Sequence, residues 1–378
     1  MESKISDVYY IDFKKVKKSI LNYIDDMYKK LPLKFDNSQS RDDKGYLIAI
    51  KLHMGEIGNT SYVRPIFIRK IVENLKKNGY KPFLTDTSTL YVGQRSNAVD
   101  YLNCAVYNGF GYDSIGCPII ISDGIRSNNF VKVETPFSKY FKYIKYAGDV
   151  AFSDGIVVIS HVKGHMLAGF GGALKNLAMG LATRSTKQQM HGDVKPQIKI
   201  DNCIGCGLCY KYCPVKAIKI INKKAQFDLN KCIGCGDCIT ICQSKALRIL
   251  WNESKEIFLE KMGDVIRAIL NDFNKPKLYF NFLMDITPDC DCMDYSRYNI
   301  TSNIGILASY DPVAIDQASI DLVQNEKLYY NFEKESFEEK EKEDKFALIN
   351  DGIDYRKFIE YCEIIGLGNK EYKLISLN

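Results

Sequence analysis

The chain has 378 residues, which is enough for two domains or for one large domain with an insertion. Its hydrophobic content of 46% is ordinary for a globular protein with a buried core. The formal net charge is +6, but the lysines and arginines form no dense stripe interleaved with aromatic residues, so we expect no nucleic-acid partner.

The N-terminus, MESKISDVYYIDFKKVKK, lacks the apolar core that a signal peptide needs. No apolar run reaches the roughly 18 residues that a membrane span needs. We therefore expect a cytoplasmic protein with no membrane span.

Residues 1–44 are expected to form an N-terminal helical segment, and residues 45–195 an α/β domain. In this domain, β-branched apolar runs predict strands, and apolar residues at helical spacing predict the helices between them. The expected strands are 46–52, 81–87, 118–124 and 155–161, and the expected helices are 64–79, 95–111 and 138–154. Such alternation is typical of a parallel, doubly wound sheet, which binds ligands beyond the carboxyl ends of its strands. Asp86, Asp123 and His161 end or follow strands, so we expect them near a common rim.

Eight of the 13 cysteines lie in two copies of the pattern C-x2-C-x2-C-x3-C, CIGCGLCYKYCP (203–214) and CIGCGDCITICQ (232–243). This run holds two [4Fe–4S] clusters in bacterial ferredoxins, where the fourth cysteine of each copy ligates the other cluster. One cluster is expected on Cys203, Cys206, Cys209 and Cys242, and the other on Cys232, Cys235, Cys238 and Cys213. Two zinc ribbons are the alternative, but such interleaved sets do not suit a four-ligand zinc site.

Residues 196–250 are therefore expected to form a 2[4Fe–4S] ferredoxin-like domain inserted into the α/β domain, which continues over residues 251–325. In this continuation the pattern predicts helices 260–272 and 311–324, the second capped by Asp311, and strands 278–286 and 304–310. Residues 326–378 are expected to be a charged C-terminal tail with a short docked helix near residues 355–365. The predicted fold class is α/β, with a parallel-type sheet and an inserted α+β bacterial-type 2[4Fe–4S] ferredoxin domain.

The stretch SHVKGHMLAGFGGALKNLAMG (160–180) carries a second candidate site. Its glycines, Gly169, Gly171 and Gly172, precede a predicted helix over 173–184, whose N-terminus could hold an anionic ligand. Lys175 lies in the first turn of that helix, where a cation opposes the helix dipole and therefore indicates ligand binding.

Lys163 and three of the four histidines lie in or near the same stretch. His161, His165 and His191 are candidate acid–base groups or metal ligands. Taken singly, each histidine is more simply a satisfied polar residue of a loop, so the prediction of a catalytic site rests on the group.

Two shorter motifs allow more than one interpretation. Cys290 and Cys292 could chelate a metal, with His53 as a distant partner, or form a redox pair, or be reduced thiols of a loop. In TDTSTLYVGQR (85–95), Asp86 and Arg95 suit a carboxylate or phosphate ligand, and the alternative is an ordinary capped turn.

Six motifs occur in a characteristic order: KLHMGEIGNTSYVRP, FLTDTSTLYVGQR, SHVKGHMLAGFGGALKNLAMG, the repeated cysteine pattern, ITPDCDC and GILASYDPVAIDQA. In this the chain resembles the bacterial and archaeal family known as domain of unknown function 362, over about residues 45–325. The resemblance implies an iron–sulfur protein and little established activity.

A second resemblance concerns His165, Lys175 and His191, whose order and spacing are similar to the active-site run of nickel-pincer lactate racemases. It implies that Lys175 tethers a nucleotide-derived cofactor, that His191 ligates nickel and that His165 transfers protons. The chain departs from that pattern, because Asp86 and Thr87 stand near the expected place of a further catalytic histidine and because racemases lack the ferredoxin insertion. The resemblance therefore implies a shared scaffold and cleft, not a shared reaction.

The sequence is compatible with three functions. The first is an iron–sulfur oxidoreductase whose two clusters exchange electrons between a redox partner protein and a cleft that binds an anionic small molecule. The second is a ferredoxin-like carrier with no catalytic site of its own. The third is a metal-handling or cofactor-maturation protein that holds an additional metal or a nucleotide-derived ligand.

Overall fold

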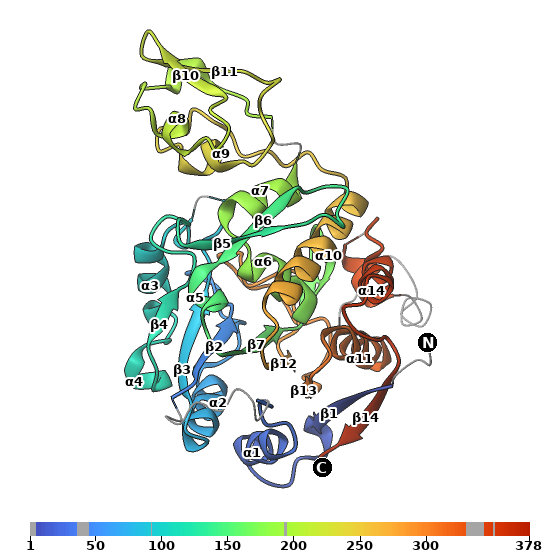
Figure 1. Cartoon of the computed structure of the whole chain (residues 1–378). Helices are drawn as coiled ribbons and strands as arrows, with labels where there is room; N and C mark the ends of the chain where they lie inside the picture. The colour runs from blue at the N-terminus through green and yellow to red at the C-terminus, as the bar shows by residue number, and fades with distance from the viewer. Residues whose placement is uncertain (1–4, 36–44, 92, 193–194, 330–343, 351) are drawn as a thin grey trace.

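A computed structural model of the protein describes residues 5–35, 45–91, 93–192, 195–329, 344–350 and 352–378. Its centre is an eight-stranded sheet in the order β14-β1-β13-β12-β7-β2-β3-β4 (Figure 1). The strands are β1 (Ser6–Asp12), β2 (Leu47–Leu52), β3 (Lys81–Asp86), β4 (Ile119–Ile121), β7 (Gly155–His161), β12 (Lys277–Leu283), β13 (Gly305–Ser309) and β14 (Tyr372–Ser376). Among these eight, β13 alone runs against its neighbours, so the carboxyl ends of β2, β3, β7 and β12 meet at one edge.

Helices cover both faces of this sheet, because each strand buries alternate side chains on opposite sides. On β2, Ile48 and Ile50 pack with α1 and α2, whereas Ala49 packs with the core on the other face. The first face carries α1 (Ile20–Lys30), α2 (Pro65–Lys77) and α3 (Ala98–Tyr107), with α4 (Tyr112–Ile115) against α2. The second carries α6 (Ala173–Leu181), α10 (Lys255–Asp272), α11 (Pro312–Asn325), α13 (Lys345–Ile349) and α14 (Tyr355–Ile364). None of the described helices is both long and apolar enough to cross a membrane.

The expected α/β fold with a mostly parallel sheet is confirmed. The predicted strands and helices of the sheet domain are found within a few residues of their expected limits, with one exception. Asp311 caps α11 as predicted, since its carboxylate accepts the backbone N–H groups of Val313 and Ala314 at 2.8 and 3.0 Å.

The exception is the helix expected over 138–154, which is wrong. That segment forms β6 (Tyr143–Ala147) and the one-turn helix α5 (Gly148–Ala151), and β6 pairs with β5 (Phe130–Glu134) as an antiparallel hairpin. The burial of β5 alternates residue by residue, which is the period of a strand, whereas β6 is buried over four consecutive residues, 144–147, and shows no such period. A second hairpin, β8 (Lys163–His165) with β9 (Gly169–Gly171), replaces the expected loop before α6.

Both ends of the chain belong to the sheet. The N-terminal segment, which we expected to be helical, supplies β1 as well as the 3-10 turn η1 (Phe13–Lys15) and α1. The segment expected to be a charged tail supplies α14, as predicted, and also β14, which pairs with β1. The centre of the charge run, 330–343, lies outside the described residues.

The cysteine-rich segment is a small lobe that stands apart from the sheet and adjoins α7 (Arg184–His191) (Figure 1). It contains η3 (Ile200–Asn202), α8 (Leu208–Tyr212), the hairpin β10 (Ile218–Ile221) with β11 (Lys224–Phe227), and α9 (Asp237–Ile241). Its two cysteine repeats have the same backbone, since Gly207 and Gly236 precede α8 and α9 with φ of +77° and +73°. Side chains other than glycine rarely adopt this left-handed conformation.

Candidate functional site

A cavity of about 710 Å³ opens at the carboxyl ends of β2, β3 and β7, where α/β sheets bind ligands. Its wall also includes α6, α7 and the loop after β12. All four histidines of the chain line it. The ionisable residues and cysteines in the wall are Lys51, His53, Glu56, Asp86, Tyr91, Arg95, His161, Lys163, His165, Lys175, Lys187, His191, Asp289, Cys290, Asp291, Cys292 and Asp294.

The common rim expected from the strand ends is found for two of its three residues. Asp86 and His161 line the cavity, whereas Asp123 is fully buried outside its lining and accepts the N–H of Ser88 at 3.0 Å. Burial raises the pKa of Asp123 above its ordinary value.

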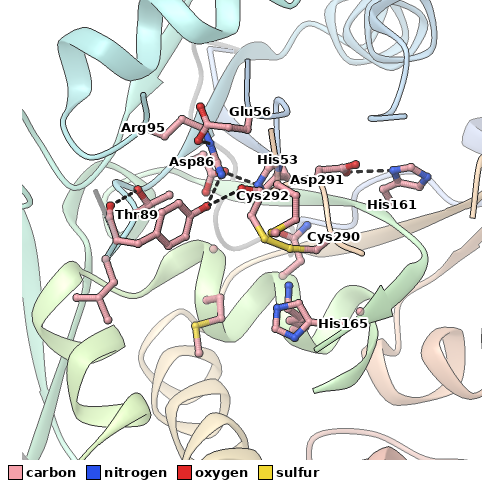
Figure 2. Close-up of a pocket in the computed structure, with 18 of the residues that line it drawn as sticks. His53, Glu56, Asp86, Thr89, Arg95, His161, His165, Cys290, Asp291 and Cys292 are labelled. Atoms are coloured by element: carbon pink, nitrogen blue, oxygen red, sulfur yellow. Dashed lines mark hydrogen bonds and ion pairs between the residues drawn. A yellow bond between two sulfur atoms is a disulfide. The ribbon is translucent and has the colours of Figure 1, made fainter. Parts of the chain in front are cut away.

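Three cations in the cavity wall already have carboxylate partners. Lys51 lies 2.9 Å from Asp86, and Arg95 lies 3.1 Å from Glu56. Arg95 also donates to Tyr91 and contacts His53 at 2.6 Å (Figure 2). The guanidinium that we expected to bind a ligand is therefore held by the protein itself.

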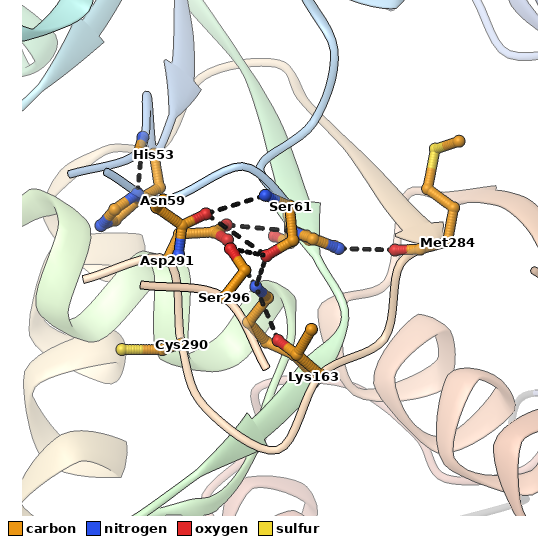
Figure 3. Close-up of polar contacts among 12 residues, drawn as sticks. His53, Asn59, Ser61, Lys163, Met284, Cys290, Asp291 and Ser296 are labelled. Atoms are coloured by element: carbon orange, nitrogen blue, oxygen red, sulfur yellow. Dashed lines mark hydrogen bonds and ion pairs between the residues drawn. The ribbon is translucent and has the colours of Figure 1, made fainter. Parts of the chain in front are cut away.

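The third pair fixes the loop that follows β12. Lys163 binds one carboxylate oxygen of Asp291 (Figure 3), and His161 Nδ1 binds the other at 3.0 Å (Figure 2). His161 Nε2 contacts the Met284 carbonyl at 2.6 Å, and Lys163 also reaches Thr287. Although burial opposes ionisation, Lys163 and His161 hold the pKa of Asp291 well below its ordinary value. The structure thus gives the two predicted catalytic residues an anchoring role.

His165 lies on the other side of the same loop. The ring nitrogen Nδ1 accepts the backbone N–H groups of Leu167 and Ala168 at 3.2 and 3.0 Å. Burial, with Lys175 and His191 nearby, lowers the pKa of His165 well below its usual value, so the ring is neutral and carries its proton on Nε2.

His165 and the two cysteines of the C-x-C motif are close neighbours. One ligand atom from each of His165, Cys290 and Cys292 lies within 4.8 Å of the others, a grouping that could hold a metal ion. The two sulfurs are joined as a disulfide, which Figure 2 shows between His165 and Asp291. Of the three interpretations of this motif, namely metal ligands, a redox pair or reduced thiols, the structure contains the oxidised pair.

Two lysines of the wall have no carboxylate partner among the described residues. Lys187 donates to Thr87 Oγ1 and the Ser88 carbonyl at 2.8 and 2.6 Å, and Lys175 makes no hydrogen bond or ion pair with any described residue. Burial lowers the pKa of each amine to about 8. Lys175 and Lys187 therefore place two positive charges in the cavity wall that have no carboxylate partner among the described residues.

His191 ends α7 with its ring held between aromatic side chains. The ring stacks on Phe258 with centroids 4.7 Å apart and meets Trp251 edge-on at 4.5 Å. Burial and the nearby lysines lower the pKa of His191 to about 3. Its imidazole is therefore neutral at physiological pH, with its lone pair available.

The N-terminus of α6, which we expected to hold an anionic ligand, is occupied by a carboxylate of the chain. The N–H groups of Ala173 and Leu174 donate to Asp316 at 2.7 and 2.9 Å. A Cβ at Gly172 would lie 2.3 Å from the Asp316 carboxylate, so only glycine permits this approach. Gly171 and Gly172 line the cavity, whereas Gly169 packs against Tyr355 outside it.

Six of the eight cysteines of the repeats lie in the interior of the small lobe with a few apolar residues, whereas Cys235 is half-buried outside this cluster and Cys206 is exposed. Burial raises the pKa of the Cys209 thiol, and the neighbouring thiolates of Cys242, Cys203 and Cys206 raise it further. Burial likewise raises the pKa of Cys238, beside Cys235, Cys232, Cys213 and also Cys209. Backbone N–H groups of Ala217 and Ala225 point to the sulfurs of Cys213 and Cys203 at 3.2 and 3.4 Å.

Sequence reasoning missed three charged residues of the site. Lys51 is the one charged residue in the otherwise apolar strand LIAIKL, and such a residue at a fully buried position is a signal for function. Lys187 lies in a polar helix whose residues 185–190 are all buried. Glu56 carried no comparable signal, because it follows a strand in a loop of ordinary composition.

Comparison with known proteins gives a family but no close relative. The family model described as domain of unknown function (DUF362) matches residues 48–321. No curated protein matches the chain. Among solved structures, the chain is similar to a Thermotoga maritima protein from the Northeast Structural Genomics Consortium, at 10% identity and a TM-score of 0.39, over 91% of this chain and 58% of that one.

It is also similar to the lactate racemase apoprotein of Thermoanaerobacterium thermosaccharolyticum, at 12% identity and a TM-score of 0.36. That match covers 74% of this chain and 51% of the other. The chain thus spans little more than half the length of either protein.

Proposed function

Because the chain belongs to the DUF362 family, whose description leaves the activity open, we propose from its own residues that it is an iron–sulfur oxidoreductase that acts on an anionic substrate in the cavity. The substrate class is a small carboxylate or phosphate ester, since Lys175 and Lys187 line the cavity and form no ion pair with a carboxylate of the described residues.

The cysteines of the lobe fit two [4Fe–4S] clusters. The neighbours of Cys209 are the other members of one predicted tetrad, and those of Cys238 include the other members of the second. The N–H groups that point to sulfur are of the kind that tunes cluster potential. When bound, such a cluster supplies or accepts one electron at a time.

The observation that carries the proposal is the position of α7. Lys187 and His191 of this helix line the cavity, while Gln189 between them donates to the carbonyl of Cys235 at 3.3 Å. Arg184, at the start of α7, donates to the Thr240 carbonyl in the lobe and to the Thr89 carbonyl in the cavity wall, both at 2.9 Å. One short helix therefore joins the cysteine-rich lobe to the cavity.

The cavity residues divide the remaining work. Lys175 and Lys187 bind the anion, which is electrostatic stabilisation in a partly desolvated site. His165 presents an N–H on Nε2 and can give a proton to the substrate as electrons arrive. Because Lys175 has a pKa of about 8, anion affinity should fall as the pH rises through that value.

The test follows electrons in the anaerobically purified protein. After reduction with dithionite, the visible absorbance of the protein is monitored while small 2-oxo acids, unsaturated carboxylates and phosphate esters are added one at a time. We expect at least one compound to reoxidise the protein, and Lys175→Met to lose at least ten-fold in that rate with an unchanged cluster spectrum.

Lys30→Met is the matched control, because Lys30 is exposed at the end of α1. It should behave as the wild type. If Lys175→Met reacted with every compound as fast as the wild type, the cavity would not be where electrons leave the protein, and a plain carrier would account for the lobe.

A second function, the holding of a further metal ion, is favoured by the grouping of His165, Cys290 and Cys292. It requires the dithiol state of the cysteine pair. Metal analysis of the reduced protein tests it, because a soft ion in addition to iron is expected.

A further inference from the structure

We propose that Cys290 and Cys292 are a redox-active pair that cycles between disulfide and dithiol in the cavity wall, as the two-electron partner of the iron–sulfur lobe. The inference rests on the proposed function, because that function supplies the electrons. It adds a site that holds two electrons close to the substrate, whereas each cluster of the lobe exchanges one at a time.

The first argument is the placement of the pair. The Cα atoms of Cys290 and Cys292 are 5.2 Å apart, within the range that a disulfide spans. Both residues line the cavity, and Cys292 is partly exposed to it. The bond therefore faces the space where the substrate would lie.

The second argument is that the pair is held independently of its bond. Asp291, between the two cysteines, is fixed by Lys163 and His161, and its carbonyl accepts the N–H of Glu56 at 3.0 Å. Tyr91 donates to the Cys292 carbonyl at 3.4 Å. The loop keeps the two sulfurs adjacent when the bond is broken, which a reversible pair requires.

These anchors also argue against a structural disulfide. A disulfide stabilises a fold by restricting the unfolded chain, and the effect grows with the length of the loop that it closes. A bond that encloses only Asp291 restricts the unfolded chain little. Because the loop is already anchored on both sides, the bond adds little to stability, and a chemical role explains it better.

The third argument is the chemistry around the sulfurs. His165 is within 4.8 Å of the pair, and its Nε2 carries the proton because Nδ1 accepts two backbone N–H groups. Lys175, which has no ion-pair partner among the described residues, lines the same cavity. An ammonium group in the cavity favours a thiolate, which is the reactive form of cysteine.

Breaking the Sγ–Sγ bond takes up two electrons, which reduced iron–sulfur centres provide one at a time, and two protons, which yields two thiols. The neighbouring His165, which carries its proton on Nε2, supplies one proton in this proposal, and water in the open cavity supplies the other and reprotonates the ring. In the reverse direction, the dithiol gives two electrons and two protons to an oxidised substrate and the bond forms again.

The experiment is an anaerobic dithionite titration of the air-oxidised holoprotein. Because each [4Fe–4S] cluster takes one electron and a disulfide takes two, we expect an uptake of about four electrons per chain in the wild type and about two in Cys290→Ser. Cys104→Ser is the matched control, since its buried thiol already donates to the Gly55 carbonyl, and it should titrate as the wild type.

A second readout assigns the electrons to residues. Samples taken before and after reduction are denatured, labelled with N-ethylmaleimide and digested, and the labelled cysteines are identified by mass spectrometry. Cys290 and Cys292 should be labelled only after reduction, either by dithionite or directly by a phosphine.

The outcomes separate the two proposals. Three results would each overturn this inference and leave the iron–sulfur function standing. They are reduced clusters with a cysteine pair that stays unlabelled after dithionite, a pair that is already labelled in the oxidised protein, and a pair that holds a metal other than iron. A protein that binds no iron would overturn the proposed function, and the inference would fall with it.

Discussion

At the scale of single residues, the cavity contains buried lysines of two kinds. Lys51 and Lys163 bind the carboxylates of Asp86 and Asp291, so their charges are compensated. Lys175 has no ion-pair partner among the residues that the structure describes, so its ammonium destabilises the fold unless a ligand binds. This difference in charge compensation separates a structural lysine from a functional one, and its effect on stability can be measured.

Lys175→Met should therefore stabilise the protein. The pKa of Lys175 is about 8 in the folded chain and ordinarily 10.5, so the unfolded chain binds the proton more tightly and protonation at pH 7 favours unfolding. We expect the free energy of unfolding to rise by about 1–2 kcal/mol at pH 7, after allowance for water in the cavity. This gain should shrink as the pH rises toward 10. Thermal melting of the variant and the wild type from pH 7 to 10 measures this gain. A difference in stability that is negative, or that does not change with pH, would contradict the prediction.

The same substitution at the compensated lysine should have the opposite effect. Lys163→Met leaves the buried carboxylate of Asp291 without its ammonium partner and with His161 as the remaining side chain of the pair. Loss of one partner of a buried ion pair costs about 3–5 kcal/mol, so a large fall in the melting temperature is expected. A melting temperature equal to that of the wild type would show that Asp291 does not depend on Lys163.

At the scale of elements, the sequence predicted the sheet strands and most helices, because apolar periodicity and caps are local signals. It did not predict which distant groups meet. The helix α6 was expected, but its N-terminal partner is Asp316 on α11, more than a hundred residues away. The hairpin of β5 and β6 was also missed, because pairing with a neighbour, and not local periodicity, determines β6.

Asp316→Ala should therefore act on stability and not on ligand binding. The carboxylate accepts N–H groups of Ala173, Leu174 and the Asn281 side chain, and loss of such bonds to a charged group costs about 2–3 kcal/mol. Chemical denaturation measures the loss, with exposed Asp113→Ala as the control. A large fall in anion affinity without loss of stability would place the ligand at this helix terminus after all.

At the scale of the whole molecule, α7 adjoins the cysteine-rich lobe (Figure 1), and its residues Lys187 and His191 line the cavity. The histidines and Lys175 of the site could be predicted because they cluster in one stretch of sequence beside glycines. The contributions of Lys51 and Lys187 could not, since only the fold shows that β2 and α7 converge on one cavity. The family resemblance stated from the motifs is confirmed over residues 48–321.

The contact between lobe and cavity should control the rate of electron exchange. Arg184→Ala removes hydrogen bonds to Thr240 in the lobe and to Thr89 and Leu90 in the cavity wall. We expect unchanged iron content and a reoxidation rate by substrate that is several-fold slower, because the lobe loses its fixed position. Arg248→Ala, an exposed arginine on the lobe, is the control. An equal loss of the reoxidation rate in both variants would mean that the contact made by α7 does not control electron exchange.

The central claim is that the lobe holds two clusters that serve the cavity, and a count of iron and acid-labile sulfide in anaerobically purified protein tests it most directly. The predicted result is about eight irons and about eight sulfides per chain for the wild type, and a marked loss of both in Cys238→Ser. Zinc in place of iron at the eight cysteines, with no labile sulfide, would contradict the account.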